Sequence, residues 1–286
     1  MSKKFAVLIV THGRSNRVIT VKTLRDSGYT GDIYLVVDNE DDELEDYKKI
    51  YGDKVIVFDK KKKFDEVDTG DNLQARNVVL FARNSCFEIA KSLGLDYFLE
   101  LDDDYDDFSF RYVDYENHNK FRRIKMRQFD KVVDTILDFL DVSGALTVTL
   151  AQCGDYIGGI GSKVWQDQLA RKAMNSFFCR VDRPFDFVGR INEDVNTYVT
   201  LSNKGHLFFT IAQACLNQLQ TQSNENGMTT IYLQYGTFTK SFYSVIYAPS
   251  CAKVGMMGST HKRIHHIISS NNCYPKILSE KWKKMQ

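Results

Sequence analysis

Hydrophobic and polar residues form alternating blocks over the first 110 positions of the chain. Four mostly apolar runs predict strands, Phe5–Val10, Ile33–Val37, Val55–Phe58 and Tyr97–Leu101, and the first, which is continuous, suits a buried parallel strand. Between these runs, the spacing of apolar residues predicts helices over Arg14–Ser27, Asp41–Tyr51 and Asn72–Leu93. This alternation predicts an α/β fold, in which helices flank a mostly parallel sheet.

The pattern is less regular outside these blocks. The charge run Lys60–Lys63 is typical of a solvated loop, whereas Phe129–Leu140 has the apolar face of a helix and Ala145–Leu150 is an apolar strand. Further features are a Gly-rich turn at 154–161, aromatic-rich strand segments within 177–187, a partly mobile loop over Gln213–Gly227 and a helix over Leu233–Tyr247.

Composition narrows the class of protein. The 286 residues are 43% hydrophobic and 26% charged, which is typical of a globular domain and excludes disorder, collagen and coiled coil. No apolar run approaches the roughly 18 residues of a membrane span, and Phe5–Val10 is too short for a signal peptide. The six cysteines are scattered without a C-x-x-C pair. We therefore expect a cytoplasmic protein with reduced thiols and no membrane partner.

Charge is distributed unevenly along the chain. Residues 195–286 contain nine Lys or Arg and two acidic residues, a sum of +7, whereas the net charge of the whole chain is +1. The remainder, residues 1–194, therefore sums to −6. This split favours an acidic part that could hold a metal and a basic part that could face a polyanion, although ordinary variation along a chain explains it equally well.

Polar residues follow three of the predicted strands. Thr11-His12-Gly13-Arg14 follows the first strand, Asp38 the second, and Asp102-Asp103-Asp104 the fourth. Because ligands bind outside the carboxyl ends of the strands in an open parallel sheet, these residues should meet at one edge. The chain has neither G-x-G-x-x-G after the first strand nor G-x-x-x-x-G-K-[ST], which weighs against a dinucleotide dehydrogenase and a P-loop NTPase.

The Asp triplet is a candidate metal site. A diphosphate ligand without a Gly-rich cradle needs a cation and an arginine, and Arg76 is placed where it could reach a phosphate. Adjacent carboxylates repel one another unless a cation compensates them, and Mg²⁺ or Mn²⁺ prefers such oxygen ligands. An acidic surface turn is the alternative interpretation.

These elements together resemble the GT-A glycosyltransferases. The segments that carry the resemblance are THGR (11–14), VVDN (36–39), TGDNLQARN (69–77), LDDD (101–104) and GRINEDVNT (189–197). The resemblance implies a Rossmann-like GT-A fold and a nucleoside diphosphate sugar as donor, with a UDP sugar favoured. Residues 1–110 would bind the nucleotide sugar, and residues 111–286 would form an elaborated acceptor-binding part with a basic C-terminal segment.

The resemblance also implies roles for individual residues. Donor binding would fall to Thr11, His12, Gly13, Arg14, Asp38, Asp71, Arg76 and Asp103. Asp102, Asp104 and a C-terminal histidine would hold the divalent metal, and we take His265 from among His261, His265 and His266. The histidines could instead line a basic acceptor cleft. Asp194 would deprotonate the acceptor in an inverting hexosyl or pentosyl transfer, unless Glu193-Asp194 only caps a helix.

The C-terminal third is similar to a narrower group, the phage glycosyltransferases associated with TET/JBP-like oxygenases. The similar segments are 220–224, 227–229, 236–245, 263–266 and 275–277. The similarity implies transfer of a sugar to 5-hydroxymethyl-pyrimidine in DNA, in the host cytoplasm if a bacteriophage encodes the protein, and the basic segment agrees with a DNA partner. Alternatives are a protein, glycan or lipid acceptor, a nucleotidyltransferase, or a non-catalytic module that binds a nucleotide sugar or DNA. The Asp triplet and Glu193-Asp194 argue against the last.

Overall fold

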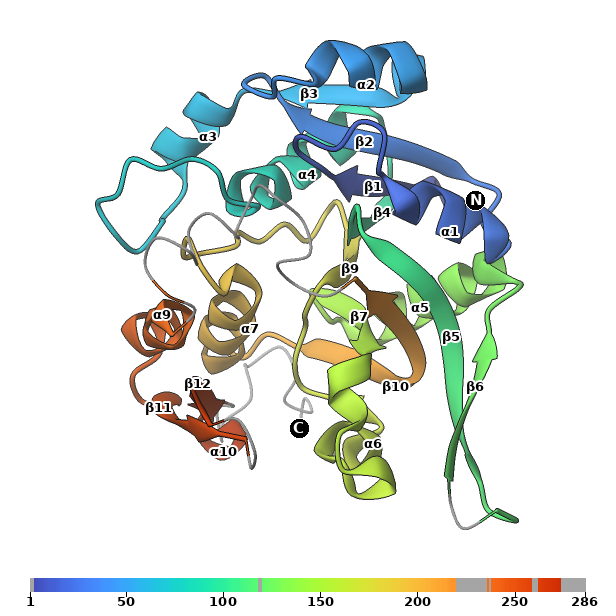
Figure 1. Ribbon diagram of the computed structural model, residues 1–286, viewed down its shortest axis with the longest axis vertical. Helices are drawn as coiled ribbons and strands as arrows, with labels where there is room; N and C mark the ends of the chain where they lie inside the picture. The colour runs from blue at the N-terminus through green and yellow to red at the C-terminus, as the bar shows by residue number, and fades with distance from the viewer. Residues whose placement is uncertain (1–2, 118–119, 220–235, 237, 259–261, 274–286) are drawn as a thin grey trace, which may run out of the picture.

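A computed structural model describes residues 3–117, 120–219, 236, 238–258 and 262–273. Within these residues a ten-stranded sheet has the order β3-β2-β1-β4-β9-β7-β10-β5-β6, with β8 paired to β10, and β11 and β12 form a separate hairpin (Figure 1). The strands are β1 (Phe5–Val10), β2 (Asp32–Asp38), β3 (Val55–Phe58), β4 (Tyr97–Asp102), β5 (Tyr105–Asp114), β6 (Lys120–Lys125), β7 (Thr147–Gln152), β8 (Leu169–Ala170), β9 (Ser176–Arg180), β10 (Phe208–Gln218), β11 (Ala252–Met257) and β12 (Arg263–Ile268).

Helices cover both faces of the sheet. They are α1 (Ile19–Asp26), α2 (Leu44–Tyr51), α3 (Lys60–Glu66), α4 (Leu80–Ser92), α5 (Phe129–Ser143), α6 (Lys163–Asp167), α7 (Glu193–Asn203), α9 (Thr239–Tyr247) and α10 (Ser270–Cys273), with short 3₁₀ turns η1 (Gly52–Lys54), η2 (Cys153–Tyr156) and η3 (Gly159–Gly161). Alternate residues of β1 point to opposite faces. Leu8 packs in a cluster with residues of α4 and α7, and Ile9 packs in a second cluster with residues of α1 and α5.

The parallel part of the sheet positions the candidate site. β1 pairs in parallel with β2 and β4, and the register sets Val10 opposite both Val36 and Asp102. The loops that follow β1, β2 and β4 therefore leave the sheet at one edge, as the sequence predicts. β7 and β10 are also parallel, whereas β9, β5, β6 and β8 pair antiparallel with their neighbours. The predicted α/β fold is confirmed, and residue 110, the predicted boundary between the two halves, lies inside β5.

Several predicted elements differ from those observed. Lys60–Lys63 is not a loop but the start of α3, which the Asp59 side chain caps by accepting from the Lys62 backbone N–H at 2.9 Å. Lys60 and Lys63 are buried because each pairs with a carboxylate. The helix predicted over Asn72–Leu93 begins only at Leu80, and the one predicted from Arg14 begins at Ile19.

The C-terminal region also departs from the pattern. Gln213 to Gln218, predicted as part of a mobile loop, belongs to β10, where it pairs with β5 and β7. The helix predicted over Leu233–Tyr247 is α9, which begins at Thr239, and the residues at 220–235 and 237 lie outside the described ranges. α9 packs against α7 and against the β11–β12 hairpin (Figure 1).

Candidate active site

The loop after β1 and the Asp triplet after β4 are tied together at the sheet edge. The buried Asp103 carboxylate accepts hydrogen bonds from Thr11 Oγ1 at 2.6 Å and from Arg14 Nη1 at 2.7 Å. The Tyr47 hydroxyl accepts from the Arg14 backbone N–H at 2.8 Å. Both oxygens of Asp103 are engaged, so this side chain holds the loop in place.

The residues that follow β1 and β2 form an ionic cluster at the same edge. His12 Nδ1 lies 2.7 Å from Asp38 Oδ2 and 3.2 Å from Asp41 Oδ2, and Lys60 Nζ donates to Asp38 Oδ1 at 3.2 Å. The hydrogen bond with Asp38, followed by the one with Asp41, raises the pKa of His12 to about 9. Gly13 has a φ of 63°, which glycine adopts without strain, and its N–H donates to Asp41 Oδ2 at 2.8 Å.

This cluster is better explained by ion pairing than by a metal. His12, Asp38 and Asp41 are the one group of three ligating side chains within 4.8 Å that the described ranges contain. His12 and Lys60 already supply positive charge to the two carboxylates, and a metal would have to displace the proton that His12 shares with them. We interpret the cluster as an anchor for the two loops, and a contact between Asp38 and a nucleoside stays a prediction.

A buried arginine that the sequence analysis missed connects the Asp triplet to α7. The Arg83 side chain on α4 is 2% exposed and donates to Glu100 at 2.6 Å, to Asp102 at 2.9 Å and to Glu193 at 2.9 Å. One guanidinium thus joins β4, the start of the triplet and the first residue of α7. Its planar fork of donors is suited to several carboxylates at once.

The signal for Arg83 was present in the sequence. The tripeptide Ala-Arg-Asn occurs twice, at 75–77 and at 82–84, and the first copy was assigned to the donor site. In the structure, Arg76 lies before α4 and pairs with Glu40 at 2.8 Å, while the second copy provides Arg83. Arg76 thus lies near the end of β2, and its contact with a phosphate remains a prediction.

Asp102 and Asp104 are the carboxylates whose setting suits a cation. Asp102 accepts from Arg83 and, at 3.2 Å, from the Tyr105 hydroxyl, and Asp104 accepts from the neutral Gln218 amide at 3.0 Å. Burial, followed by the negative charges of Asp102 and Asp103, raises the pKa of Asp104 to about 7. The negative charge here is incompletely compensated, and oxygen donors of this kind fit Mg²⁺ or Mn²⁺.

Asp194 lies at the start of α7, beside this network. The helix follows Asn192, whose φ of 57° is left-handed, and Asp194 Oδ1 accepts from the Val195 N–H at 2.7 Å. Burial, followed by the charge of Glu193, raises the pKa of Asp194 to about 7, and Asp102 adds to the shift. The acids that the sequence assigned to the metal and to the base therefore share one electrostatic environment.

The structure does not bring His265 together with Asp102 and Asp104 as a group within 4.8 Å, among the side chains it describes. His265 on β12 stacks on His266, with 4.3 Å between ring centroids, and His266 Nδ1 lies 3.1 Å from Asn192 Nδ2. Burial, followed by the charges of Lys240 and Arg263, lowers the pKa of His265. This shift favours the neutral form of the ring. The neighbouring His266 lies close to the start of α7, and His261 lies outside the described ranges.

Asp71 has partners of its own. Arg190, which is buried, donates through Nε to both Asp71 oxygens at 2.9 and 3.0 Å, and the Tyr243 hydroxyl of α9 also donates to Asp71. Arg190 donates further to the carbonyls of Leu73, at 2.6 Å, and Ala75. These bonds hold the loop before α4 against α9, which gives Asp71 a structural role in addition to any contact with a donor.

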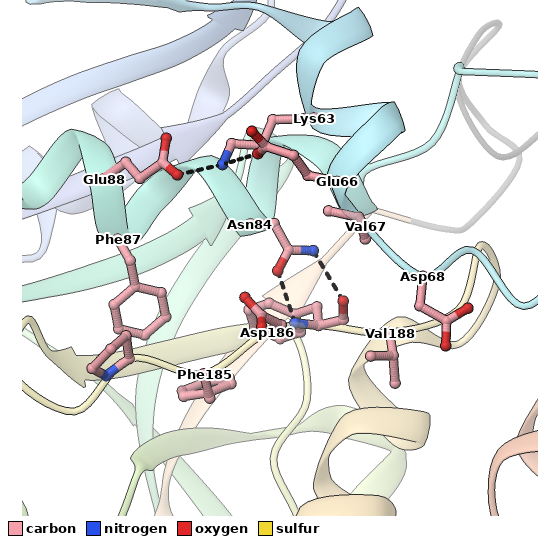
Figure 2. Close-up of a pocket in the computed structure, with 12 residues that line it drawn as sticks. Lys63, Glu66, Val67, Asp68, Asn84, Phe87, Glu88, Phe185, Asp186 and Val188 are labelled. Carbon is pink, nitrogen blue, oxygen red and sulfur yellow. Dashed lines mark hydrogen bonds and ion pairs between the residues drawn. The ribbon is translucent and has the colours of Figure 1, made fainter.

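A separate cavity of about 380 Å³ lies between α3, α4 and residues 184–188 (Figure 2). Asn84 beside it bonds the backbone of Phe187 in both directions, at 2.9 and 3.0 Å, and Lys63 pairs with Glu66 and Glu88. None of the residues assigned to donor, metal or base lines this cavity, so we do not assign the active site to it.

The family of the chain follows from comparison with protein-family models. The model of the TET-associated glycosyltransferases matches residues 5–227, which include every assigned site residue except His265. The chain belongs to the TET-associated glycosyltransferase family. The predicted resemblance to this family is thereby confirmed, and the family model indicates a glycosyltransferase. No curated protein sequence matches this transferase.

The first of three similar solved structures supports the predicted GT-A fold of this transferase. The mannosyltransferase PcManGT from Pyrobaculum calidifontis, in complex with GDP-Man and Mn²⁺, has a TM-score of 0.50 at 10% identity, over 87% of this chain and 64% of that one. Glucosyl-3-phosphoglycerate synthase from Mycobacterium tuberculosis has a TM-score of 0.47 at 10% identity, over 92% of this chain and 89% of that one. S. aureus TarS 1–349 in complex with UDP has a TM-score of 0.42 at 12% identity, over 75% of this chain and 60% of that one. In the described part of the transferase no helix has the length and apolarity that a membrane crossing needs.

Proposed function

We propose that this transferase moves a sugar from a nucleoside diphosphate sugar, with a UDP sugar favoured, to the hydroxyl of 5-hydroxymethyl-pyrimidine in DNA. The observation that carries the proposal is the family match, together with a buried acid, Asp194, set beside the Asp triplet. The family name associates these enzymes with TET oxygenases, and the complexes of the structural neighbours with UDP or GDP-Man and Mn²⁺ support a nucleotide sugar and a metal.

The donor would lie along the edge formed by the ends of β1, β2 and β4. Asp38, held by His12 and Lys60, would accept hydrogen bonds from the nucleoside, and Arg14, fixed by Asp103, would face the diphosphate. Asp102 and Asp104 would hold the divalent cation, which supplies positive charge to the diphosphate leaving group. Arg83 would keep Asp102 and Glu193 in place through its ion pairs with both.

Asp194 would act as the base. Its raised pKa, about 7, makes it a stronger base than an ordinary carboxylate and leaves much of it ionised at neutral pH. The carboxylate would take the proton of the acceptor hydroxyl as the hydroxyl oxygen attacks the anomeric carbon. The bond between that carbon and the diphosphate oxygen would break on the opposite side, and the electron pair would leave with the diphosphate, giving inversion.

Charge supports DNA as the acceptor. The +7 segment 195–286 includes Lys240 on α9, Lys253 on β11, and Lys262 and Arg263 at β12, and α9 packs directly on α7, which bears Asp194. Contacts between such cations and phosphates are the main source of DNA affinity. The further lysines at 276, 281, 283 and 284 lie outside the described ranges.

Release of the nucleoside diphosphate tests the proposal. The enzyme is incubated with Mn²⁺ and a panel of nucleotide sugars, with either hydroxymethylated DNA or unmodified DNA of the same sequence. We expect one donor to release its diphosphate far faster with the hydroxymethylated DNA. Equal release with both DNAs would mean hydrolysis or another acceptor, and a glycan, protein or lipid acceptor would then be examined.

A further inference from the structure

β5 and β6 form a two-stranded ribbon that leads away from the Asp triplet. β5 begins at Tyr105, directly after Asp104, and ten residues of strand span roughly 33 Å. At its base the ribbon lies under the helices, because Phe108 packs on Phe129 of α5 with 4.9 Å between ring centroids. Farther along, the ribbon extends beyond the helix layer at the end of the sheet (Figure 1).

The two faces of the ribbon differ. On one face the register brings Val113 opposite Phe121, and Phe121 packs on Tyr156 at 5.5 Å and on Trp165 at 4.7 Å, between ring centroids. The segment of η2 and α6 therefore covers this face. The other face has Phe110 opposite Ile124 and Tyr112 opposite Arg122, and beyond them Asp114 opposite Lys120.

The uncovered face combines apolar and aromatic surface with positive charge. Phe110 is 40% exposed, Tyr112 43% and Ile124 56%. β6 has four cations and no acid, and two of the cations, Lys120 and Arg122, lie on this face, whereas Arg123 and Lys125 lie on the covered one. Arg122 pairs with Asp114 at 3.0 Å, and Arg123 pairs with Asp107 at 3.6 Å. Residues 107–127 as a whole have six Lys or Arg and three acids, which gives them a net charge of +3.

Protection of an edge strand explains the cations of β6 but not the exposed apolar residues beside them. Lysines on an edge strand discourage pairing with other chains, but that purpose does not require Phe110, Tyr112 and Ile124 to stand exposed on the adjoining face. A second copy of the chain is a poor occupant, because the same face of two copies would bring Lys120 and Arg122 of one against those of the other. Cations interleaved with exposed aromatic rings are the surface that nucleic acids bind.

We propose that the uncovered face of the β5–β6 ribbon binds the DNA strand that flanks the acceptor base, an inference that rests on the proposed function. Lys120 and Arg122 contact phosphates, and Tyr112 and Phe110 pack on bases or sugars. Because the ribbon begins at the Asp triplet, a strand lying along it leads to the catalytic edge. At the 3.4 Å per nucleotide of one strand of a duplex, its length corresponds to roughly ten nucleotides.

Binding of single-stranded DNA without donor tests the proposal. Fluorescence anisotropy is measured with oligonucleotides of about 30 and about 6 nucleotides, each containing one hydroxymethylated base, because only the longer can reach along the ribbon. The variants are Lys120→Gln/Arg122→Gln and, separately, Tyr112→Ser. The control Lys48→Gln/Lys54→Gln removes the same charge beside β3, at the opposite end of the sheet.

We expect the charge variant to weaken binding of the long oligonucleotide at least about tenfold and to flatten its salt slope by about 1.4, since each phosphate contact with a single strand contributes about 0.7. Tyr112→Ser should weaken it about fivefold or more. The control should bind as wild type does, and all proteins should bind the short oligonucleotide equally. Circular dichroism and thermal unfolding check the folding of each variant.

The proposal is wrong if both ribbon variants bind the long oligonucleotide within twofold of wild type. It is also wrong if they instead dissociate a dimer in sedimentation, which would make the face an interface between copies. Sugar transfer is measured in parallel. If the ribbon variants transfer sugar to hydroxymethylated DNA as well as wild type does, the role of the ribbon is refuted and the proposed function stands. If DNA binding depends on the ribbon but wild type transfers no sugar to hydroxymethylated DNA, the proposed function is refuted and the role of the ribbon stands.

Discussion

Replacement of Arg83 by methionine should destabilise the protein strongly. The guanidinium is 2% exposed and pairs with Glu100, Asp102 and Glu193 at 2.6 to 2.9 Å. Methionine fills similar volume but leaves three carboxylates, two of them buried, without their cation. Loss of one partner from a buried ionic network costs about 3–5 kcal/mol, which is a large share of the roughly 5–15 kcal/mol that holds a typical domain.

Urea unfolding at neutral pH gives the magnitude, and the second Ala-Arg-Asn copy supplies a matched control. Arg76→Met removes an arginine whose ion pair with Glu40 is about one-third exposed, and such pairs contribute about 0–1 kcal/mol. Adding Glu100→Gln to Arg83→Met should recover part of the loss, because it removes one uncompensated charge. A loss below about 1 kcal/mol for Arg83→Met, or equal losses at Arg83 and Arg76, would refute the reasoning.

Four further outcomes are expected. The ion pairs of His12 raise its pKa to about 9, so their contribution to stability is complete below the unfolded value near 6.5 and is lost as pH rises through 9; the stability difference between wild type and His12→Gln should shrink over that window in urea titrations. Asp194→Asn should lower kcat by orders of magnitude and leave the donor KM unchanged, and wild-type kcat should fall as pH drops through about 7; loss of donor binding with an intact kcat would indicate a capping residue. Asp104→Ala should abolish transfer and preserve the fold by circular dichroism, and excess chelator should do the same to wild type, so full turnover in chelator would contradict a metal site. The KM for DNA should rise steeply with salt while the donor KM responds little, and charge reversal in the C-terminal segment should raise it further, tested at Lys240, Lys253, Lys262 and Arg263.

The sequence predicted the parallel strands and their polar ends well. Continuous apolar runs located Phe5–Val10, a buried strand, and Val55–Phe58, a partly exposed strand at the end of the sheet, to the residue. The position of a residue after a strand also fixes which edge it occupies. That rule brought Thr11, Asp38 and the Asp triplet together before their contacts were known.

Features that depend on tertiary contacts were not accessible in the same way. The helix period alone could not distinguish Arg76 from Arg83, because only the strand opposite α4 shows which arginine meets Asp102. Lys60 reads as a solvated residue until its pairing with Asp38 is seen. The β5–β6 ribbon mixes aromatic, acidic and basic residues, and it lacks the regular alternation that marks a strand with one solvated face.

The measurement that bears most directly on the central claim is the mass of the nucleosides obtained from hydroxymethylated DNA. The DNA is incubated with Mn²⁺, the preferred donor, and either wild-type protein or Asp194→Asn, and is then digested completely. We expect the wild-type sample to contain a hydroxymethyl-pyrimidine nucleoside heavier by one glycosyl group, and the Asp194→Asn sample to contain almost none. Unmodified hydroxymethyl nucleosides after prolonged incubation of wild type with every donor, or equal conversion by both proteins, would contradict the account.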